Sequence, residues 1–262
     1  MTQFVPLDGY SVTATTAPSK FNPGFTTEEI AQIAKLIGGE SENVINSPAA
    51  RLEELRLNSA DKVAEFALSE TDFFSFLATN VLPRIPASVL EGIEDGELRE
   101  RVAAFKDSMF PVGVVTTHDV RLANALATSL IVEDADGNIV LTERAEGLPV
   151  GGGIYGVSAT SGVSIDDVLD GAPITGAVAR EARQSLGLDI DANDIAVQGV
   201  AFGVTKSQPA VLCHVKLSSV LSPDDIQVSE KNKRAIIVSK SDEDFLNGIE
   251  VSEVARLHLE RI

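Results

Sequence analysis

A glycine-rich segment, Gly151-Gly152-Gly153-Ile154-Tyr155-Gly156, has the G-x-G-x-x-G spacing of dinucleotide-binding proteins. That fingerprint binds a pyrophosphate only where it follows a strand and opens a helix, because the helix N-terminus receives the negative charge. The residues that follow here, VSATSGVS, are poor helix formers. The segment is therefore interpreted as a turn or as a loop beside a ligand site, and a Rossmann site is rejected.

The histidines and the cysteine are too scattered to form a recognisable reactive site. His118, His214 and His258 lack the H-E-x-x-H spacing of a zinc site. Cys213 is the only cysteine, so intramolecular disulfides are excluded, and its apolar surroundings predict a buried, unreactive thiol. The sequence also contains neither G-x-S-x-G nor G-x-x-x-x-G-K-[ST]. These four side chains are interpreted as structural.

A more specific pattern runs from Arg180 to Leu188 and reads REARQSLGL. It resembles the second half of the Nudix box, which is Arg-Glu-aliphatic-x-Glu-Glu-x-Gly-aliphatic, and in the full box seven residues separate this half from an upstream glutamate. The matching residues are Arg180, Glu181, Gly187 and Leu188, with Ala182 at the aliphatic position. The resemblance covers about residues 119–262. It implies an α/β (α+β) fold, in which a Nudix-like mixed sheet packs around a central box helix.

In the Nudix family the box glutamates hold Mg²⁺ or Mn²⁺ against a diphosphate, and the metal activates water. The resemblance thus implies that Glu181 is a metal ligand or catalytic base, with Arg144 and Lys206 as candidates for contacting phosphate. The two later acidic positions of the box are Gln184 and Ser185, which supply no charge. Because these hard cations prefer several carboxylate oxygens, Mg²⁺ or Mn²⁺ is expected to bind weakly if at all.

The upstream glutamate of the box is also changed, because seven residues separate it from the arginine in the family and the residue at that position here is Ala172. In the family this glutamate pairs with the arginine, so Arg180 is expected to lack its partner and to be an ordinary surface or interface residue. Asp166, Asp167 and Asp170 lie just upstream and are one alternative source of metal ligands. The other interpretation of the same residues is a solvated turn.

The elements that must position these residues are strands on either side of one helix. Residues 125–133 and 138–144 predict a hairpin around Asp136-Gly137. Ile174–Leu186 predicts a helix that buries Ala177, Val178 and Leu186 and ends at Gly187. Further strands are predicted at 195–204, 209–217 and 234–239, and a last helix at 251–260.

The first half of the chain is predicted to be helical after an irregular arm of 25 residues. Thr26 and Glu29 have the spacing of a capping box. Helices are predicted from residue 26 to 37, 48 to 57, 60 to 68, 73 to 82 with Thr71 as its cap, and 94 to 106. The predicted organisation is therefore an N-terminal arm and helical module at 1–118 and a Nudix-like domain at 119–262.

Composition limits the classes of partner. Apolar residues make up 44% of the chain, enough for a core, and no apolar run is long enough for a membrane helix. The net charge is −18, and the acidic excess is spread over both halves, so nucleic-acid binding is not expected. The N-terminus, MTQFVPLDGY, lacks the pattern of a signal peptide, and a cytoplasmic location is the expectation.

The sequence therefore predicts a Nudix-like protein that binds a nucleoside diphosphate derivative, with weak or lost metal-dependent pyrophosphohydrolase activity. The alternative is a non-catalytic protein-interaction or regulatory module on the same fold, and a homodimer is compatible with either. A chance match of the box on an unrelated α+β fold is the third interpretation.

Overall fold

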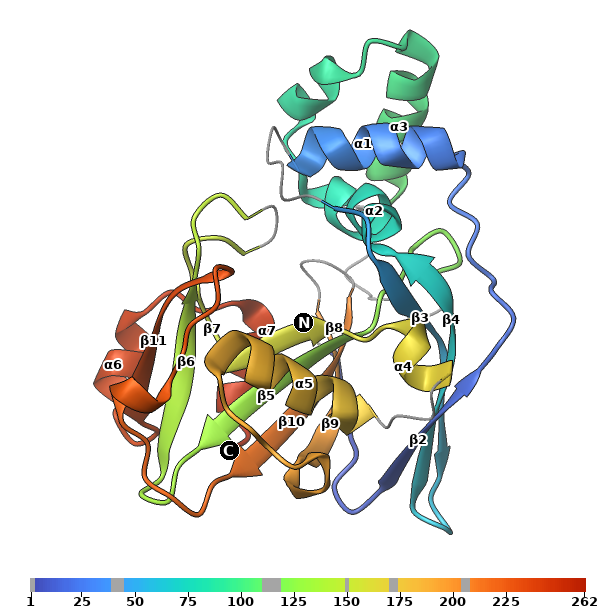
Figure 1. Cartoon of the computed structure of the whole chain (residues 1–262). Coiled ribbons are helices and arrows are strands. Elements are labelled where there is room, and N and C mark those ends of the chain that lie inside the picture. Colours follow the sequence, from blue (N-terminus) through green and yellow to red (C-terminus); the bar gives the residue numbers. More distant parts are fainter. Residues whose placement is uncertain (1–2, 39–44, 110–118, 149–150, 170–173, 204–207) are drawn as a thin grey trace.

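The computed structural model of the chain describes residues 3–38, 45–109, 119–148, 151–169, 174–203 and 208–262. It contains a large sheet, a small sheet and a group of helices at the far end of the small sheet (Figure 1). The predicted fold class, a mixed sheet with a central helix, is confirmed. Within the described ranges, every helix is too short or too polar to cross a membrane.

The large sheet has the strand order β1-β9-β10-β5-β6-β11, with β7 paired to β6 and β8 paired to β5. The strands are β1 (Gln3–Pro6), β5 (Ala127–Glu133), β6 (Asn138–Arg144), β7 (Tyr155–Gly156), β8 (Ala159–Gly162), β9 (Ala196–Phe202), β10 (Pro209–Lys216) and β11 (Asn232–Ser239). Strands β5 and β10 run parallel, and the other pairs are antiparallel. The hairpin and the later strands predicted from the sequence are confirmed.

The edge strand β1 comes from the segment predicted to be irregular, and that prediction is wrong for residues 3–6. Pro6 lies opposite Gly199 of β9. A Cβ atom at residue 199 would lie 2.5 Å from the carbonyl oxygen of Val5, so only glycine allows the two strands to approach this closely. Part of the N-terminal arm therefore belongs to the same sheet as the C-terminal half of the chain.

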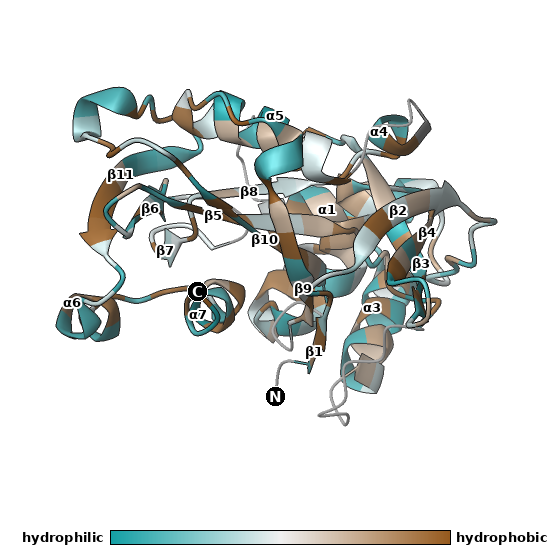
Figure 2. Ribbon diagram, turned by 90° about the horizontal axis from the view of Figure 1, so that it is seen from below, coloured by the Kyte–Doolittle hydropathy of each residue, from teal (hydrophilic) through white to brown (hydrophobic). Residues whose placement is uncertain are grey.

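Helices cover both faces of the large sheet. Helix α5 (Ile174–Leu186) lies on one face, and α6 (Glu243–Gly248) and α7 (Glu253–Leu259) lie on the other (Figure 2). Side chains alternate along β5, because successive residues of a strand point to opposite faces. Leu130 and Val132 belong to the core cluster beneath α5, whereas Ile131 belongs to the cluster that contains Ala255 of α7. Both faces of the sheet are therefore buried at its centre.

The second sheet has the order β2-β4-β3 and is formed by β2 (Ser11–Thr16), β3 (Pro48–Asn58) and β4 (Val63–Asp72). The helices predicted at 48–57 and 60–68 are therefore wrong, and so is the irregular state predicted for 11–16. Ala64, Phe66 and Leu68, at every second position, belong to one core cluster, which is the period of a strand. Strand β3 pairs with β4 in a hairpin, and this strand pairing overrides the helical interpretation of the same residues.

Three helical segments form a layer beyond the small sheet (Figure 1). They are α1 (Thr27–Gly38), α2 (Phe73–Phe76) with further helical turns to Arg84, and α3 (Gly96–Met109). The predicted capping box is confirmed, because Thr26 N–H donates to Glu29 Oε2 at 2.8 Å and Glu29 N–H donates to Thr26 Oγ1 at 3.3 Å. Asp72, rather than Thr71, caps α2.

The two sheets are joined by hydrogen bonds and by a common core. Ala50 N–H donates to Val163 O at 2.7 Å, and Leu126 N–H donates to Ala50 O at 2.8 Å. A single hydrophobic cluster contains Phe66 of the small sheet and Val178 of α5. Helix α4 (Ile165–Leu169) lies between α5 and the small sheet. This continuous packing fixes α5 against the rest of the molecule.

Candidate functional site

Helix α5 forms where the sequence predicted it and carries the box residues. Ala177, Val178 and Leu186 are buried as expected, and the helix ends at Gly187, whose φ is +70°. Glu181 lies on the same buried side and is only 5% exposed. A carboxylate removed from water in this way needs polar partners, because an isolated buried charge is costly.

Glu181 finds its partners within the chain. Ser185, one turn later on α5, donates a short hydrogen bond to Glu181 Oε1. The Lys231 ammonium lies 3.9 Å from the same oxygen. Arg144, at the end of β6, lies close enough for its charge to interact with that of Glu181. Glu181 therefore contacts a hydroxyl and lies near one ammonium, and its charge interacts with that of Arg144.

Arg144 is half-buried beside this carboxylate. Its Nη1 donates to Thr160 Oγ1 at 3.3 Å, and its Nε is buried without a hydrogen-bond partner among the described residues. Burial lowers the pKa of the Arg144 guanidinium, and the Glu181 charge opposes that shift. We refer to Arg144, Thr160, Glu181, Ser185 and Lys231 together as the Arg144–Glu181 site.

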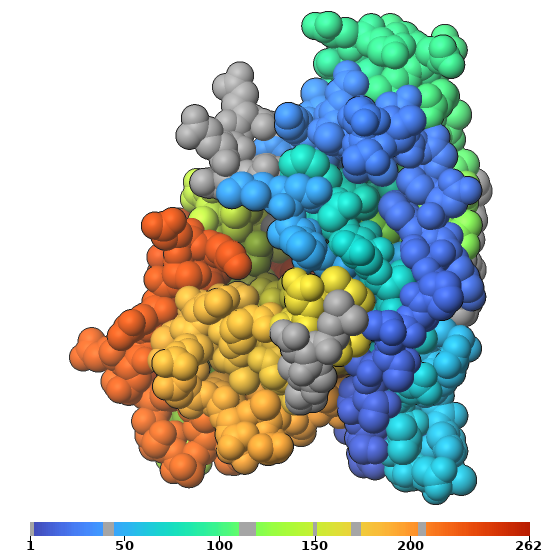
Figure 3. Space-filling model, turned by 45° about the vertical axis from the view of Figure 1, so that its right-hand side comes forward, coloured from blue at the N-terminus to red at the C-terminus, as the bar shows by residue number. Residues whose placement is uncertain are grey.

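Lys231 is held at the site by the backbone of residues 227–232. Gln227 N–H donates to Leu186 O at 2.9 Å, and Ser229 N–H donates to Ser185 O at 3.1 Å. Ala145 N–H donates to Lys231 O at 3.0 Å. In the space-filling view the surface is hollowed above α5, between the orange-red residues that lead into β11 and the yellow residues of β8 and α4 (Figure 3).

Arg180 has a partner, contrary to the expectation drawn from Ala172. Its Nη2 donates to Asp167 Oδ2 at 2.9 Å, and its Nη1 donates a second, shorter bond to Oδ1. Burial acts to raise the Asp167 pKa, but the bonds from Arg180 and from the Ser164 backbone outweigh it, so that pKa lies below its ordinary value. Asp167 thus takes the contact that the missing box glutamate would make.

The structure does not place all of the predicted site residues. Lys206, Asp170 and Ala172 lie outside the described residues. Asp166 is exposed at the start of α4, and its backbone N–H donates to Ser164 Oγ at 3.3 Å. Because both oxygens of Asp167 are bonded to Arg180, Asp167 is used in an ion pair and does not supply a metal ligand beside Glu181.

The donors around Glu181 do not fit Mg²⁺ or Mn²⁺. The described part of the chain holds no group of three or more His, Cys, Asp or Glu side chains suited to a metal ion. The Gln184 side chain is exposed and neutral, and the Ser185 hydroxyl donates to the one available carboxylate. Lys231 adds a positive charge where a divalent cation would need negative ones. We therefore derive no chemical step through a metal ion at this site.

The glycine-rich segment forms a turn and the short strand β7, and no helix opens at its end in the described residues 151–169 before α4. Gly153 N–H donates to Arg144 O at 3.2 Å, and Arg144 N–H donates to Ile154 O at 3.1 Å. The interpretation as a turn is confirmed. The turn is hydrogen-bonded to the backbone of Arg144 itself, at the end of β6.

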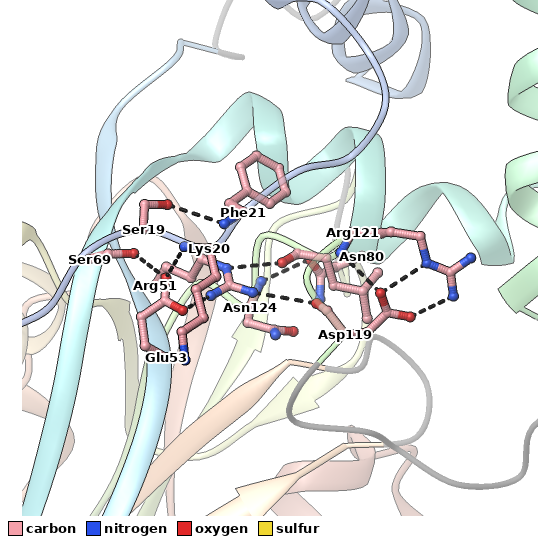
Figure 4. Close-up of polar contacts among 11 residues, drawn as sticks. Ser19, Lys20, Phe21, Arg51, Glu53, Ser69, Asn80, Asp119, Arg121 and Asn124 are labelled. Carbon is pink, nitrogen blue, oxygen red and sulfur yellow. Dashed lines mark hydrogen bonds and ion pairs between the residues drawn. The ribbon is translucent and has the colours of Figure 1, made fainter.

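A second buried polar cluster lies where the small sheet meets residues 119–124 (Figure 4). Arg51 forms an ion pair with Glu53, and its Nε donates to Leu122 O at 3.2 Å. Glu53 also accepts from Ser69 Oγ at 2.6 Å and from Lys20 N–H at 3.1 Å. Burial acts to raise the Glu53 pKa, but these hydrogen bonds outweigh it, and the pKa lies below its ordinary value. This cluster could not be predicted from the sequence, because the residues that Arg51 and Glu53 contact outside their own strand are 16 to 71 positions away in the chain.

The contacts of Arg51 and Glu53 indicate a structural role. Arg51 reaches the backbone of residues 119 and 122 as well as Glu53, and the carboxylate is matched by three donors. Buried charges whose hydrogen-bonding groups are already used within the protein hold segments together but have no free donor or acceptor for a ligand. The cluster joins β3 to the chain that leads into β5.

Of the histidines and the cysteine that were interpreted as structural, His214, His258 and Cys213 lie within the described residues. His118 lies outside them. Cys213 is fully buried, and burial raises the pKa of its thiol to about 12. His258 is buried, its Nδ1 is hydrogen-bonded to Ser129 Oγ at 3.1 Å, and burial lowers its pKa to about 3. Burial also lowers the pKa of His214, despite the nearby Glu133.

Comparison with known proteins gave no matching family model and no matching curated protein. Solved structures do match. A MutT protein from Methanosarcina mazei is 20% identical with a TM-score of 0.41, and the match covers 52% of this chain and 91% of that one. A Nudix hydrolase from Alicyclobacillus acidocaldarius is 10% identical with a TM-score of 0.41, covering 52% of this chain and 89% of that one.

A third solved structure is the Nudix domain of NrtR from Shewanella oneidensis, bound to ADP ribose. It is 9% identical with a TM-score of 0.38, and the match covers 52% of this chain and 84% of that one. Each of these three matches covers about half of this chain.

Proposed function

We propose that the chain binds a nucleoside diphosphate derivative at the Arg144–Glu181 site and hydrolyses it weakly or not at all. The observation that carries the proposal is the surroundings of Glu181. Its carboxylate accepts from Ser185 and lies 3.9 Å from the Lys231 ammonium, with Arg144 nearby. Cations of this kind bind phosphate oxygens, whereas a metal-activated hydrolase needs several carboxylates around the metal.

The two halves of the proposal follow from the same residues. Arg144 can offer N–H donors to a diphosphate, and the Lys231 side chain is 65% exposed and within reach of a ligand. Hydrolysis additionally requires a group that activates water. Glu181 is the candidate carboxylate for that role, but its Oε1 already accepts a hydrogen bond from the Ser185 hydroxyl. Binding is therefore favoured over turnover.

Isothermal titration with ADP-ribose and with ADP, in the presence of Mg²⁺, tests the binding half. We expect both to bind, and Arg144→Gln to weaken binding about tenfold, the effect of losing one charge-assisted contact. Arg256→Gln is the matched control, because Arg256 is an exposed arginine of α7, on the opposite face of the large sheet.

Phosphorus NMR of the same mixtures, with Mg²⁺ or Mn²⁺, tests the hydrolysis half. Slow or absent product formation supports the proposal. Rapid metal-dependent hydrolysis that Glu181→Gln abolishes would contradict it. If neither ADP-ribose nor ADP binds, the nucleotide proposal fails, and the interaction module predicted as the alternative becomes the better hypothesis.

A further inference from the structure

The charges around the Arg144–Glu181 site leave an excess of positive charge in a strongly acidic protein. Arg180 is matched by Asp167. Glu143 and Glu146 form ion pairs with two cations of β11. Lys233 lies 3.0 Å from Glu143 and 3.3 Å from Glu146. Arg234 lies 2.6 Å from Glu143. What remains is one carboxylate, Glu181, with Lys231 beside it and the charge of Arg144 interacting with it.

We propose that Lys231 is a built-in counter-cation of this site, and that a diphosphate group binds between Lys231 and Arg144 without a divalent metal ion. The inference rests on the proposed function, because it names how that function's ligand is held. It also assigns a role to a residue outside the box, 50 positions along the chain from Glu181.

The position of Lys231 supports this role. Its backbone carbonyl accepts from Ala145 N–H at 3.0 Å, next to Arg144, and its neighbour Asn232 pairs with Arg144 across β6 and β11. The two cations therefore come from adjacent strand ends with fixed backbones. An ammonium has three N–H donors, and the Lys231 side chain is 65% exposed, so it can contact Glu181 and a phosphate oxygen together.

Glu181 then has a positioning role, because it lies beside the ammonium on its buried side. A divalent cation at the same carboxylate would have to displace Lys231 or lie beside it, and like charges repel. The Ser185 bond to Glu181 further reduces the electron pairs open to a metal. The arrangement therefore favours an anion directly and gives Mg²⁺ no advantage.

Isothermal titration of inorganic pyrophosphate and of ADP into the whole protein tests the inference, once with excess EDTA and once with excess Mg²⁺. We expect the wild-type dissociation constants in the two buffers to agree within about threefold. Lys231→Met should weaken binding in EDTA about tenfold, and Lys231→Arg should retain it, because arginine keeps the charge. Lys35→Met, at an exposed lysine of α1, is the matched control.

The outcomes separate the inference from the proposed function. Binding that requires Mg²⁺, or that Lys231→Met leaves unchanged while the protein remains folded by circular dichroism, would overturn the inference and leave the proposed function standing. Absence of binding in both buffers would overturn the proposed function and the inference with it. If Lys231→Met fails to fold, comparing the wild type with Lys231→Arg in the two buffers still decides the metal requirement.

Discussion

Glu181 is the one carboxylate in the segment Arg180–Leu188, and its neighbours decide what it can bind. Gln184 lies three residues later on α5, so a carboxylate there would lie on the same side of the helix. We predict that Gln184→Glu combined with Lys231→Met raises Mn²⁺ affinity at least about tenfold, because it adds one ligand charge and removes one competing cation. Isothermal titration of Mn²⁺ measures this.

The matched control is Gln32→Glu with Lys35→Met on α1, which makes the same chemical changes far from the site. That control should leave Mn²⁺ binding as in the wild type. Ser185 is left in place because it is buried, and a longer side chain there would disturb the packing of α5. Equal Mn²⁺ affinity in the wild type and the double variant would show that the site does not depend on these charges.

His258 makes the stability of the fold depend on pH. Burial lowers its pKa to about 3, whereas in the unfolded chain the pKa returns to about 6.5. The unfolded state therefore binds more protons between these values, and the stabilisation is complete above pH 6.5 and is lost as the pH falls toward 3. We predict a loss of about 2 kcal/mol in the free energy of unfolding between pH 7 and pH 5.

Urea denaturation at pH 7, 6 and 5 tests this, with His258→Gln expected to flatten the dependence. The range above pH 5 is chosen because Glu133 and Glu53, whose pKa values are lowered, titrate below it. His214 contributes in the same direction, since burial also lowers its pKa, so some dependence should remain in the variant. If the free energy of unfolding of His258→Gln depends on pH as strongly as that of the wild type, the effect comes from other groups.

At the scale of elements, the end of α5 positions the segment that carries Lys231. Gly187 has φ of +70°, and a Cβ there would lie 3.0 Å from the Cβ of Gln227. We predict that Gly187→Ala destabilises the fold by about 1–2 kcal/mol, because a side chain is disfavoured in this conformation. Gly248→Ala in α6, where a Cβ meets nothing within 4 Å, should change stability by less than about 0.5 kcal/mol.

Urea denaturation of both glycine variants gives the comparison. If the segment 227–231 moves with Gly187→Ala, pyrophosphate binding should weaken as well, although residue 187 is not one of the site residues. Gly187→Ala with the stability and binding of the wild type would mean that the helix end does not position Lys231.

The sequence predicted the elements whose ends carry a local signal, and it failed where only the pairing of strands decides between helix and strand. Helix α5 and the hairpin of β5 and β6 were predicted because a glycine end and an Asp-Gly turn mark their limits. Strands β3 and β4 were predicted as helices, because short runs of Ala and Leu fit both periods and only their mutual pairing decides. Among the site residues, Arg144 and Glu181 were predicted from the sequence. The contact of Lys231 with Glu181 and the pairing of Arg180 with Asp167 could be found only in the folded chain.

At the scale of the whole molecule, Arg51 forms an ion pair with Glu53 of the same strand and joins the small sheet, through its bond to Leu122 O, to the chain that enters the large one (Figure 4). We predict that Arg51→Met destabilises the protein by about 3–5 kcal/mol, because Glu53 is left as a buried, poorly matched charge. Replacing both residues by Met should recover much of that loss.

Arg56→Met on the same strand is the control, because its bonds to Glu54 and Glu65 are exposed and should contribute less than about 1 kcal/mol. Chemical denaturation followed by circular dichroism measures all three. If Arg51→Met and Arg56→Met lower the free energy of unfolding equally, burial of the Arg51–Glu53 pair does not increase its contribution to stability.

The pairing of β1 with β9 also constrains the order of events during synthesis. Gln3 lies opposite Phe202, so the first strand has no partner until about two hundred residues have been made. At about 5–20 residues per second, this is a wait of roughly 10–40 seconds on the ribosome. The small sheet, complete by residue 72, has its partners much earlier. During that interval β1 is an unpaired strand, which makes the nascent chain a substrate for chaperones that bind extended segments.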